Sequence, residues 1–261
     1  MKSKEVFSLL IYGFSGLVLL FSLSQVVGIA GLYGKFSYGE LTTYFLNDSY
    51  TSFFTFPFCL GALLVNKTQK ESNLYFLISR YNSRLAYLWQ RISNSLIIAS
   101  KYYVIILLLS VLAGISNSQF DSKTSVAFQE LAKTFASEPT SISKSVFMNA
   151  VQSGLCYLLL MVILVLFFIL LTQIKLNGAV VFAVFCVAIS LNAFACLGFF
   201  GNIFINSNLF ALLLPFQSTY HFGLRILFGV SGILMLLILN ALLICKRDLV
   251  LPKTNKNYET E

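Results

Sequence analysis

Charged residues are scarce in this chain, and their scarcity decides its broad class. Asp, Glu, Lys and Arg make up 11% of the 261 residues, whereas soluble domains carry about 25%. Hydrophobic residues make up 57%, and the mean hydropathy is +0.82. This composition excludes an ordinary soluble domain. It predicts an all-α integral membrane protein, with residues 1–261 forming a single transmembrane domain.

Groups that carry out catalysis are also scarce. The chain has one histidine, His221, and no HExxH, GxSxG or GxxxxGK[ST] motif. Gly34-Lys35 lacks both the earlier glycine and the following Ser or Thr of a phosphate-binding loop. We therefore predict that the chain is not an enzyme and has no catalytic, cofactor-binding or metal-binding residues.

Two further absences narrow the function. The apolar runs contain no Asp or Glu, which argues against a membrane hydrolase and against a proton-coupled carrier, because carriers keep ionisable groups in their pathway. The five cysteines lie in apolar runs without a CxxC pair, so we expect them to act as small packing residues.

Six apolar runs are long enough to be membrane spans. They cover residues 7–30, 49–65, 95–115, 148–172, 178–200 and 223–245. The second is short and contains Pro57, so we expect it to begin earlier or to be kinked. The first exceeds the core of a signal peptide, which is about 7–15 residues, so we expect it to be retained. Arg225, near one end of the sixth, is expected to snorkel to the headgroups.

The placement of Lys and Arg predicts the orientation. Segments on the side of the N-terminus hold 12 of them, and segments on the other side hold 5. Acidic residues divide evenly, five and five. Positive charge favours the cytoplasmic side, so both termini are predicted to be cytoplasmic. The net charge of +8 thus reflects topology and contact with anionic lipid, and no soluble basic domain remains to bind nucleic acid.

Two loops on the outer side have patterns of their own. In the loop over residues 116–147, Phe128, Leu131, Ala132 and Phe135 follow helical spacing before Pro139. They predict an amphipathic helix that lies on the bilayer surface or caps the bundle. The loop over residues 201–222 has an apolar core too short to cross, so we expect a re-entrant or interfacial hairpin between spans five and six.

A basic, polar segment, residues 66–94, separates the second and third spans. Asn82-Ser83 predicts a break with a helix N-cap between two short helices, residues 72–81 and 84–93. The second has an apolar stripe with two arginines close together at its edge: Leu85, Leu88, Trp89 and Ile92, with Arg84 and Arg91. One interpretation is a surface helix whose arginines bind anionic lipid. The other is a coupling helix that docks into a groove of a cytoplasmic partner.

Polar residues inside the spans allow two interpretations as well. Lys101 lies in the third run, about 10 Å from the inner end of its helix, and either snorkels or lies on a substrate path. Amides also occur in the runs, and such groups bridge helices more often than they line a path. They are Asn149, Gln152, Asn192 and Asn240.

The loop motif and the topology together resemble the type-2 ABC exporter permease family, the six-helix membrane subunits of ATP-binding-cassette transporters. In that family an acidic residue precedes a leucine-rich helix that ends in Ser, and Ser-Arg then precedes an apolar helix with a basic residue. The matching residues here are Glu71, Leu74, Leu77, Ile78, Ser79, Ser83-Arg84 and Arg91. The chain departs from the pattern at Tyr81-Asn82, where the family often has Pro.

The resemblance implies a dimer of permease subunits, identical or different, in the cell membrane of a bacterium. ATP and magnesium would bind a separate nucleotide-binding ATPase. The export of a peptide, antibiotic or bacteriocin is the function it suggests. The residues it assigns to ATPase coupling are Glu71, Ser79, Arg80, Ser83, Arg84, Leu85, Leu88, Trp89 and Arg91. Two alternatives stay open, a secondary carrier or channel and a membrane anchor or assembly protein without a transport role.

Overall fold

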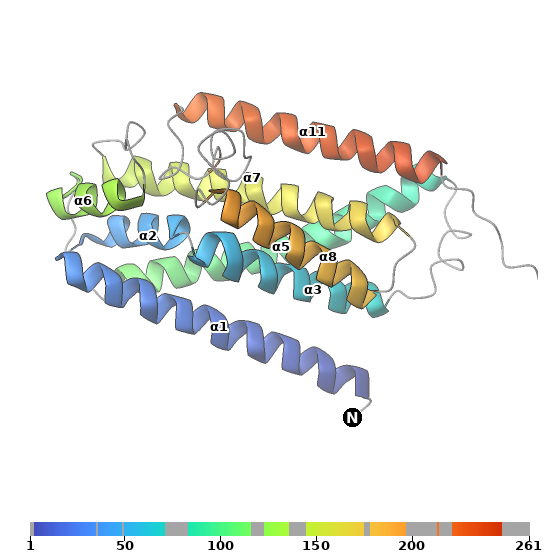
Figure 1. Cartoon of the computed structure of the whole chain (residues 1–261), viewed down its shortest axis with the longest axis horizontal. Coiled ribbons are helices and arrows are strands. Elements are labelled where there is room, and N and C mark those ends of the chain that lie inside the picture. The colour runs from blue at the N-terminus through green and yellow to red at the C-terminus, as the bar shows by residue number, and fades with distance from the viewer. Residues whose placement is uncertain are drawn as a thin grey trace, which may run out of the picture.

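The described part of the chain is helical, as predicted. The computed structural model describes residues 3–34, 36–48, 50–70, 83–115, 123–135, 145–174, 178–196, 213 and 221–246. Within these ranges there is no β-strand, and one isolated antiparallel bridge joins Lys123 to Ser145. The helices run along a common long axis and form an elongated bundle (Figure 1).

Five helices in the described ranges are long and apolar enough to cross a membrane. They are α1 (Ser3–Tyr33), α5 (Arg84–Ile115), α7 (Val146–Gln173), α8 (Gly178–Cys196) and α11 (Phe222–Lys246). They correspond to the first, third, fourth, fifth and sixth apolar runs, so the chain has the helices of a multi-pass membrane protein. The predicted hairpin between α8 and α11 lies almost wholly outside the described residues, and the orientation of the termini stays a prediction.

The predicted second span is broken into three pieces. They are α2 (Tyr38–Asn47), a π-helix η1 (Thr51–Thr55) and α3 (Phe56–Lys70), which follow one another along the bundle (Figure 1). The backbone leaves the helix at Asp48, where ψ is 125°. The helical segment therefore begins earlier than the apolar run, and it is interrupted, as the short run with Pro57 led us to expect.

The π-helix has a local cause in Pro57. In an α-helix the N–H of residue 57 would donate to the Phe53 carbonyl, but proline has no N–H. The chain instead widens by one residue, and the Phe56 N–H donates to the carbonyl oxygen of Thr51, five residues earlier. The register becomes α-helical again in α3.

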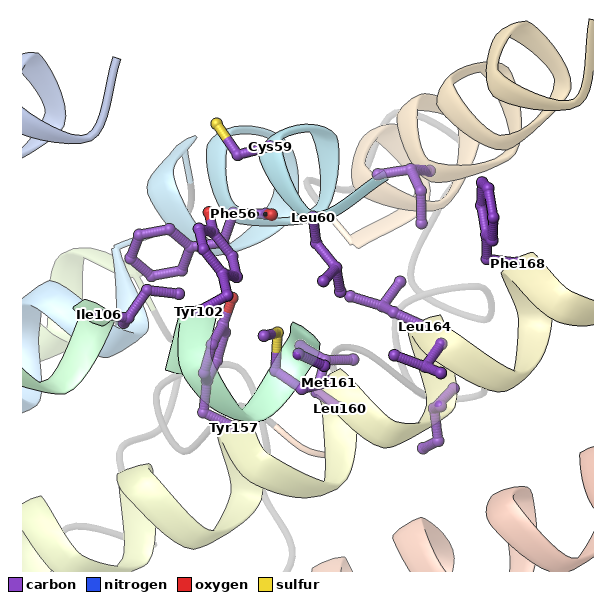
Figure 2. Packing of buried hydrophobic residues seen from close by; sticks show 14 of the residues in the cluster. Phe56, Cys59, Leu60, Tyr102, Ile106, Tyr157, Leu160, Met161, Leu164 and Phe168 are labelled. Atoms are coloured by element: carbon purple, nitrogen blue, oxygen red, sulfur yellow. Dashed lines mark hydrogen bonds between the residues drawn. The ribbon is translucent and has the colours of Figure 1, made fainter. Parts of the chain in front are cut away.

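The centre of the bundle is α7, which contacts α2, α3, α5, α8 and α11. Figure 2 shows how α3, α5 and α7 meet, with Phe56 and Leu60 facing Tyr157, Leu160 and neighbouring side chains. The rings of Phe56 and Tyr157 pack edge to face, 5.2 Å between centroids. Dense apolar packing of this kind holds the three helices together.

The outward faces of the peripheral helices are also apolar. Phe14 and Leu17 on α1 and Leu227 and Met235 on α11 are each at least 60% exposed. Soluble monomers rarely carry continuous apolar faces of this extent. Hydrocarbon chains would cover them in a bilayer, which agrees with the helices' length and composition.

A short helix, α6 (Val126–Phe135), closes one end of the bundle, and it confirms the predicted amphipathic helix. Phe128 and Leu131 are fully buried, and the Phe128 ring packs edge to face on Phe36, 6.1 Å between centroids. Of the two predicted arrangements, α6 adopts the one that caps the bundle. We call this end the α6 end, and the opposite end, where α5 begins and α11 finishes, the Arg84 end.

Candidate functional site

The first turn of α5 contains the predicted helix cap. The hydroxyl oxygen of Ser83 accepts a hydrogen bond from the Ala86 N–H at 3.1 Å, and the Ser83 carbonyl accepts from the Tyr87 N–H at 3.2 Å. The predicted N-cap is thus confirmed, whereas the predicted first short helix, residues 72–81, lies outside the described residues. The helix does not end near residue 93, however. It continues to Ile115, so the candidate coupling helix and the third span form one continuous helix.

The apolar stripe at the start of α5 is partly buried and partly exposed. Leu88 and Ile92 are buried in the bundle, 5% and 3% exposed. Leu85 and Trp89 are 46% and 63% exposed. The prediction that all four face a partner is wrong, because the edge of the bundle runs along the helix between the two pairs. Leu85 and Trp89, four residues apart on one face, form the exposed contact surface that remains.

The two arginines at the start of α5 do not lie at the edge of that exposed surface as predicted. The Arg84 guanidinium donates from Nη1 to the Cys245 carbonyl oxygen at 2.8 Å, and so joins the start of α5 to the last turn of α11. A cation in this position satisfies a carbonyl that the helix end leaves free. Arg91 is buried, 8% exposed. Both side chains therefore contribute to packing within the bundle.

The other predicted residues divide into two groups. Glu71, Ser79 and Arg80 lie outside the described residues, so their coupling role stays a prediction. Lys101 lies on α5 with its side chain exposed on the outside of the bundle. An exposed position within one chain agrees with snorkelling.

Two carboxylates lie inside the bundle, although the apolar runs themselves contain no Asp or Glu. Glu40 is 1% exposed and Asp48 is 5% exposed. Both precede the second apolar run, because the helical segment that leads into this run begins at Tyr38, eleven residues earlier. Hydropathy alone misses such a segment, since polar residues in α2 lower its average.

Glu40 joins the starts of two helices. Its Oε2 accepts the Ser37 N–H at 2.8 Å, and its Oε1 accepts the Ser125 N–H just before α6. Both are N–H groups at helix N-termini, where the helix dipole favours a negative charge. Ser37 and Glu40 have the spacing of a capping box, and that sequence signal could have located this carboxylate.

A polar seam runs along the break between α2 and η1. It is defined by Asn47, Asp48, Thr51, Ser52 and Ser153. Asp48 Oδ2 accepts the Thr51 N–H at 2.9 Å and its hydroxyl at 2.7 Å, and Asn47 Nδ2 donates to Ser153 Oγ on α7 at 2.9 Å. The first of these bonds satisfies a backbone N–H at the interruption of the helix, which an apolar interior requires. The other two join polar side chains to one another.

Asn240 joins α11 to α7, as predicted for amides in the spans. It is fully buried, and its Oδ1 accepts from Gln173 Nε2 at 2.6 Å. Its Nδ2 donates to the Leu166 carbonyl on α7 at 3.1 Å. Asn240 is therefore a structural bridge.

Arg225 is buried, and the prediction that it snorkels is wrong. Its side chain is 0% exposed on the first turn of α11, 5.8 Å from the ring centroid of Phe222. Nε and Nη1 have no hydrogen-bond acceptor among the described residues. Sequence reasoning missed this burial because the position lies close to the end of an apolar run, where long cations usually reach water.

A cavity of about 390 Å³ lies among α1, η1, α3 and α8. Its walls are apolar, and two thiols, Cys59 and Cys186, belong to them. Figure 2 shows the Cys59 side chain pointing away from α7. The cavity has the size and polarity for an acyl chain or another lipophilic group. In the described ranges no group of three His, Cys, Asp or Glu residues could hold a metal ion.

Comparison with protein-family models, characterised proteins and solved structures gave no match.

Proposed function

We propose that this chain is the membrane-spanning permease subunit of an ABC transporter, an exporter driven by a separate cytoplasmic ATPase. In this proposal α2, η1 and α3 together make the second of six crossings, and both termini are cytoplasmic. The substrate class suggested by the loop motif is a peptide, antibiotic or bacteriocin. The subunit pairs with a second permease subunit in a bacterial plasma membrane.

The supporting observation is the continuity of α5 with its exposed first turns. The helix has 32 residues, so it is about 48 Å long, and the hydrocarbon core of a bilayer is about 30 Å thick. A helix of this length extends beyond the core, and in this proposal it does so at the Arg84 end, where Leu85 and Trp89 are exposed. A soluble partner that contacts these residues would contact one end of a continuous helix, α5.

Hydrogen bonds join α5 to the rest of the bundle. Arg84 joins it to α11, the Tyr102 hydroxyl donates to the Phe56 carbonyl on α3 at 3.3 Å, and the Tyr103 hydroxyl donates to the Gly154 carbonyl on α7 at 2.8 Å. Displacement of the first turn of α5 would thus reach α3, α7 and α11. This is what a transport cycle driven by ATP binding to another subunit requires.

The absence of a phosphate-binding motif from the sequence supports a separate ATPase. With no GxxxxGK[ST], the chain lacks the loop that holds nucleotide phosphates in such transporters. ATP and magnesium accordingly belong to the partner. We expect the permease alone to show no ATP hydrolysis.

The test is recruitment of the ATPase to Leu85→Ala, Trp89→Ala and the double variant, by pull-down from detergent-solubilised membranes. Exposed apolar anchors at the centre of an interface contribute about 2 kcal/mol or more each, which corresponds to roughly 30-fold in affinity. We expect the double variant to lose the ATPase while the permease keeps its melting temperature.

Two matched variants control this test. Leu108→Ala removes an equally exposed leucine farther along α5 and should leave recruitment unchanged. Leu88→Ala removes a buried leucine and should lower permease stability first. Full recruitment by the Leu85→Ala, Trp89→Ala variant would argue against a coupling surface here.

A secondary carrier is the second candidate, because the structure has two features typical of carriers. One is a discontinuous helical segment, and the other is a pair of buried carboxylates, Glu40 and Asp48. Backbone N–H groups already occupy both carboxylates, which favours a structural role. Reconstituted vesicles distinguish the candidates: a carrier moves substrate on an ion gradient without ATP and loses that activity in Asp48→Asn.

A further inference from the structure

Among the described residues, no carboxylate pairs with the buried Arg225. It is among the largest fully buried side chains, and Nε and Nη1 find no acceptor in the described ranges. A guanidinium stays protonated in proteins, so the positive charge cannot be discharged by loss of a proton. A buried charge without hydrogen-bond partners is costly, and ionisable residues in membrane segments commonly mark functional sites.

The carboxylates of the described residues are engaged elsewhere or lie on the surface. Glu40 accepts the N–H groups of Ser37 and Ser125, Asp48 accepts that of Thr51, and Glu130 is exposed on α6. In the sequence, residues 197–220, which lead into α11, contain no Asp or Glu. None of these three carboxylates therefore pairs with this cation.

The surroundings of Arg225 add to its positive potential. It lies in the first turn of α11, where the Arg225 N–H donates to the His221 carbonyl at 3.2 Å and the helix dipole is positive. The Phe222 ring face lies beside the guanidinium, but a ring does not satisfy its N–H donors in the way oxygen acceptors do.

The packing one turn farther along α11 closes the site on that side. Gly229 lies four residues after Arg225 on the same face of the helix. A Cβ at Gly229 would lie 2.8 Å from Leu159 Cδ1 and 3.0 Å from Leu213 Cδ2. A ligand beside Arg225 therefore has no room on the Gly229 side.

We propose that Arg225 and the first turn of α11 form a buried binding site for an oxyanion, either a phosphate or a carboxylate. The guanidinium fork matches two oxygens of such a group. A free anion and the headgroup of an anionic lipid offer the same chemistry. The inference does not rest on coupling to an ATPase, since it concerns a site at the opposite end of the bundle from Leu85 and Trp89.

The test is the melting temperature of the purified full-length chain in a neutral detergent, titrated with two probes. One probe is sodium phosphate, with sodium chloride as the match for ionic strength. The other is dihexanoyl phosphatidylglycerol, with dihexanoyl phosphatidylcholine as the match for a short-chain lipid. A ligand at well above its Kd stabilises the folded state, and we expect a rise of roughly 3 °C with at least one probe over its match.

Variants locate the effect at Arg225. Arg225→Gln should abolish the rise, Arg225→Lys should keep part of it, and Lys101→Gln, which removes an exposed cation from α5, should keep it whole. A rise with phosphate supports a free anion as ligand, and a rise with the lipid alone supports a headgroup. The proposal is overturned if neither probe stabilises the native chain, or if Arg225→Gln keeps the full rise. If Arg225→Gln fails to fold, Arg225→Lys locates the effect, and an undiminished rise in that variant would overturn the proposal.

Discussion

At the scale of single residues, glycines in α5 and α1 have opposite surroundings. A Cβ at Gly114 would lie 2.8 Å from the Tyr38 carbonyl oxygen, an atom of the backbone that cannot rotate away. A Cβ at Gly28 would meet nothing within 4 Å. The close approach of α5 to the start of α2 therefore depends on Gly114.

We expect Gly114→Ala to lower the free energy of unfolding by about 1–3 kcal/mol, the usual cost of overpacking. Gly28→Ala should be neutral or should stabilise by up to about 1 kcal/mol, through higher helix propensity. Denaturation of the two purified variants in the same detergent measures both. Equal stabilities would contradict the packing of α5 on α2.

Asn240 offers a second prediction at this scale. Asn240→Leu removes the bonds to Gln173 and to the Leu166 carbonyl, and hydrogen bonds between membrane helices are worth about 0.6 kcal/mol on average and up to about 1.7. We expect a loss in this range, and coupling to Gln173→Leu in a double-mutant cycle. Ser231→Ala is the control, because that exposed hydroxyl bonds only to a carbonyl of its own helix among the described contacts. Additive effects of Asn240→Leu and Gln173→Leu would argue against the bridge.

Residue roles could be predicted from the sequence where the cause is local. Ser83 is a correctly predicted cap because a cap depends on the next three residues. Arg91, Leu88 and Arg225 are buried where exposure was expected, because their burial depends on helices distant in the sequence. No local pattern carries that information.

At the scale of elements, the continuous apolar runs correctly predicted the five long helices. The interruption of the second helical segment was only partly predicted. Pro57 indicated an irregularity, and the π-helix before it is the result. The start at Tyr38 could not be inferred from hydropathy. The polar residues of α2 form hydrogen bonds with Ser125, just before α6, and with Ser153 on α7. Only the folded structure brings these groups together.

The cavity among α1, η1, α3 and α8 can be probed through its thiols. Cys186 lines it and is half-buried, whereas Cys156 and Cys196 are buried in the bundle. In membranes, a lipophilic reagent such as pyrenyl maleimide should therefore modify Cys186 several-fold faster than the other two.

A filled cavity should slow that reaction. Ala62→Phe places a ring in the cavity, and we expect slower modification of Cys186. Ala183→Phe, on an exposed position of α8 away from the cavity, should leave the rate unchanged. Equal rates in the two variants would show that the reagent does not reach Cys186 through this cavity.

At the scale of the whole molecule, the charge bias predicts six crossings with both termini cytoplasmic. Lys2→Cys, Lys123→Cys and Lys256→Cys, each in a background without the native cysteines, report the side on which each position lies. A membrane-impermeant maleimide added to intact cells should modify only position 123. Modification of position 256 from outside would contradict the six crossings.

The central claim is that ATP hydrolysis by a separate protein drives transport through this chain. The most direct measurement is affinity purification of the chain from its native membranes in mild detergent, followed by an assay of magnesium-dependent ATP hydrolysis and identification of the bound proteins. We predict a bound soluble protein with a phosphate-binding loop, hydrolysis in the complex, and none in the chain stripped of that protein. A chain that purifies without any nucleotide-binding protein yet still moves substrate in vesicles would contradict the claim.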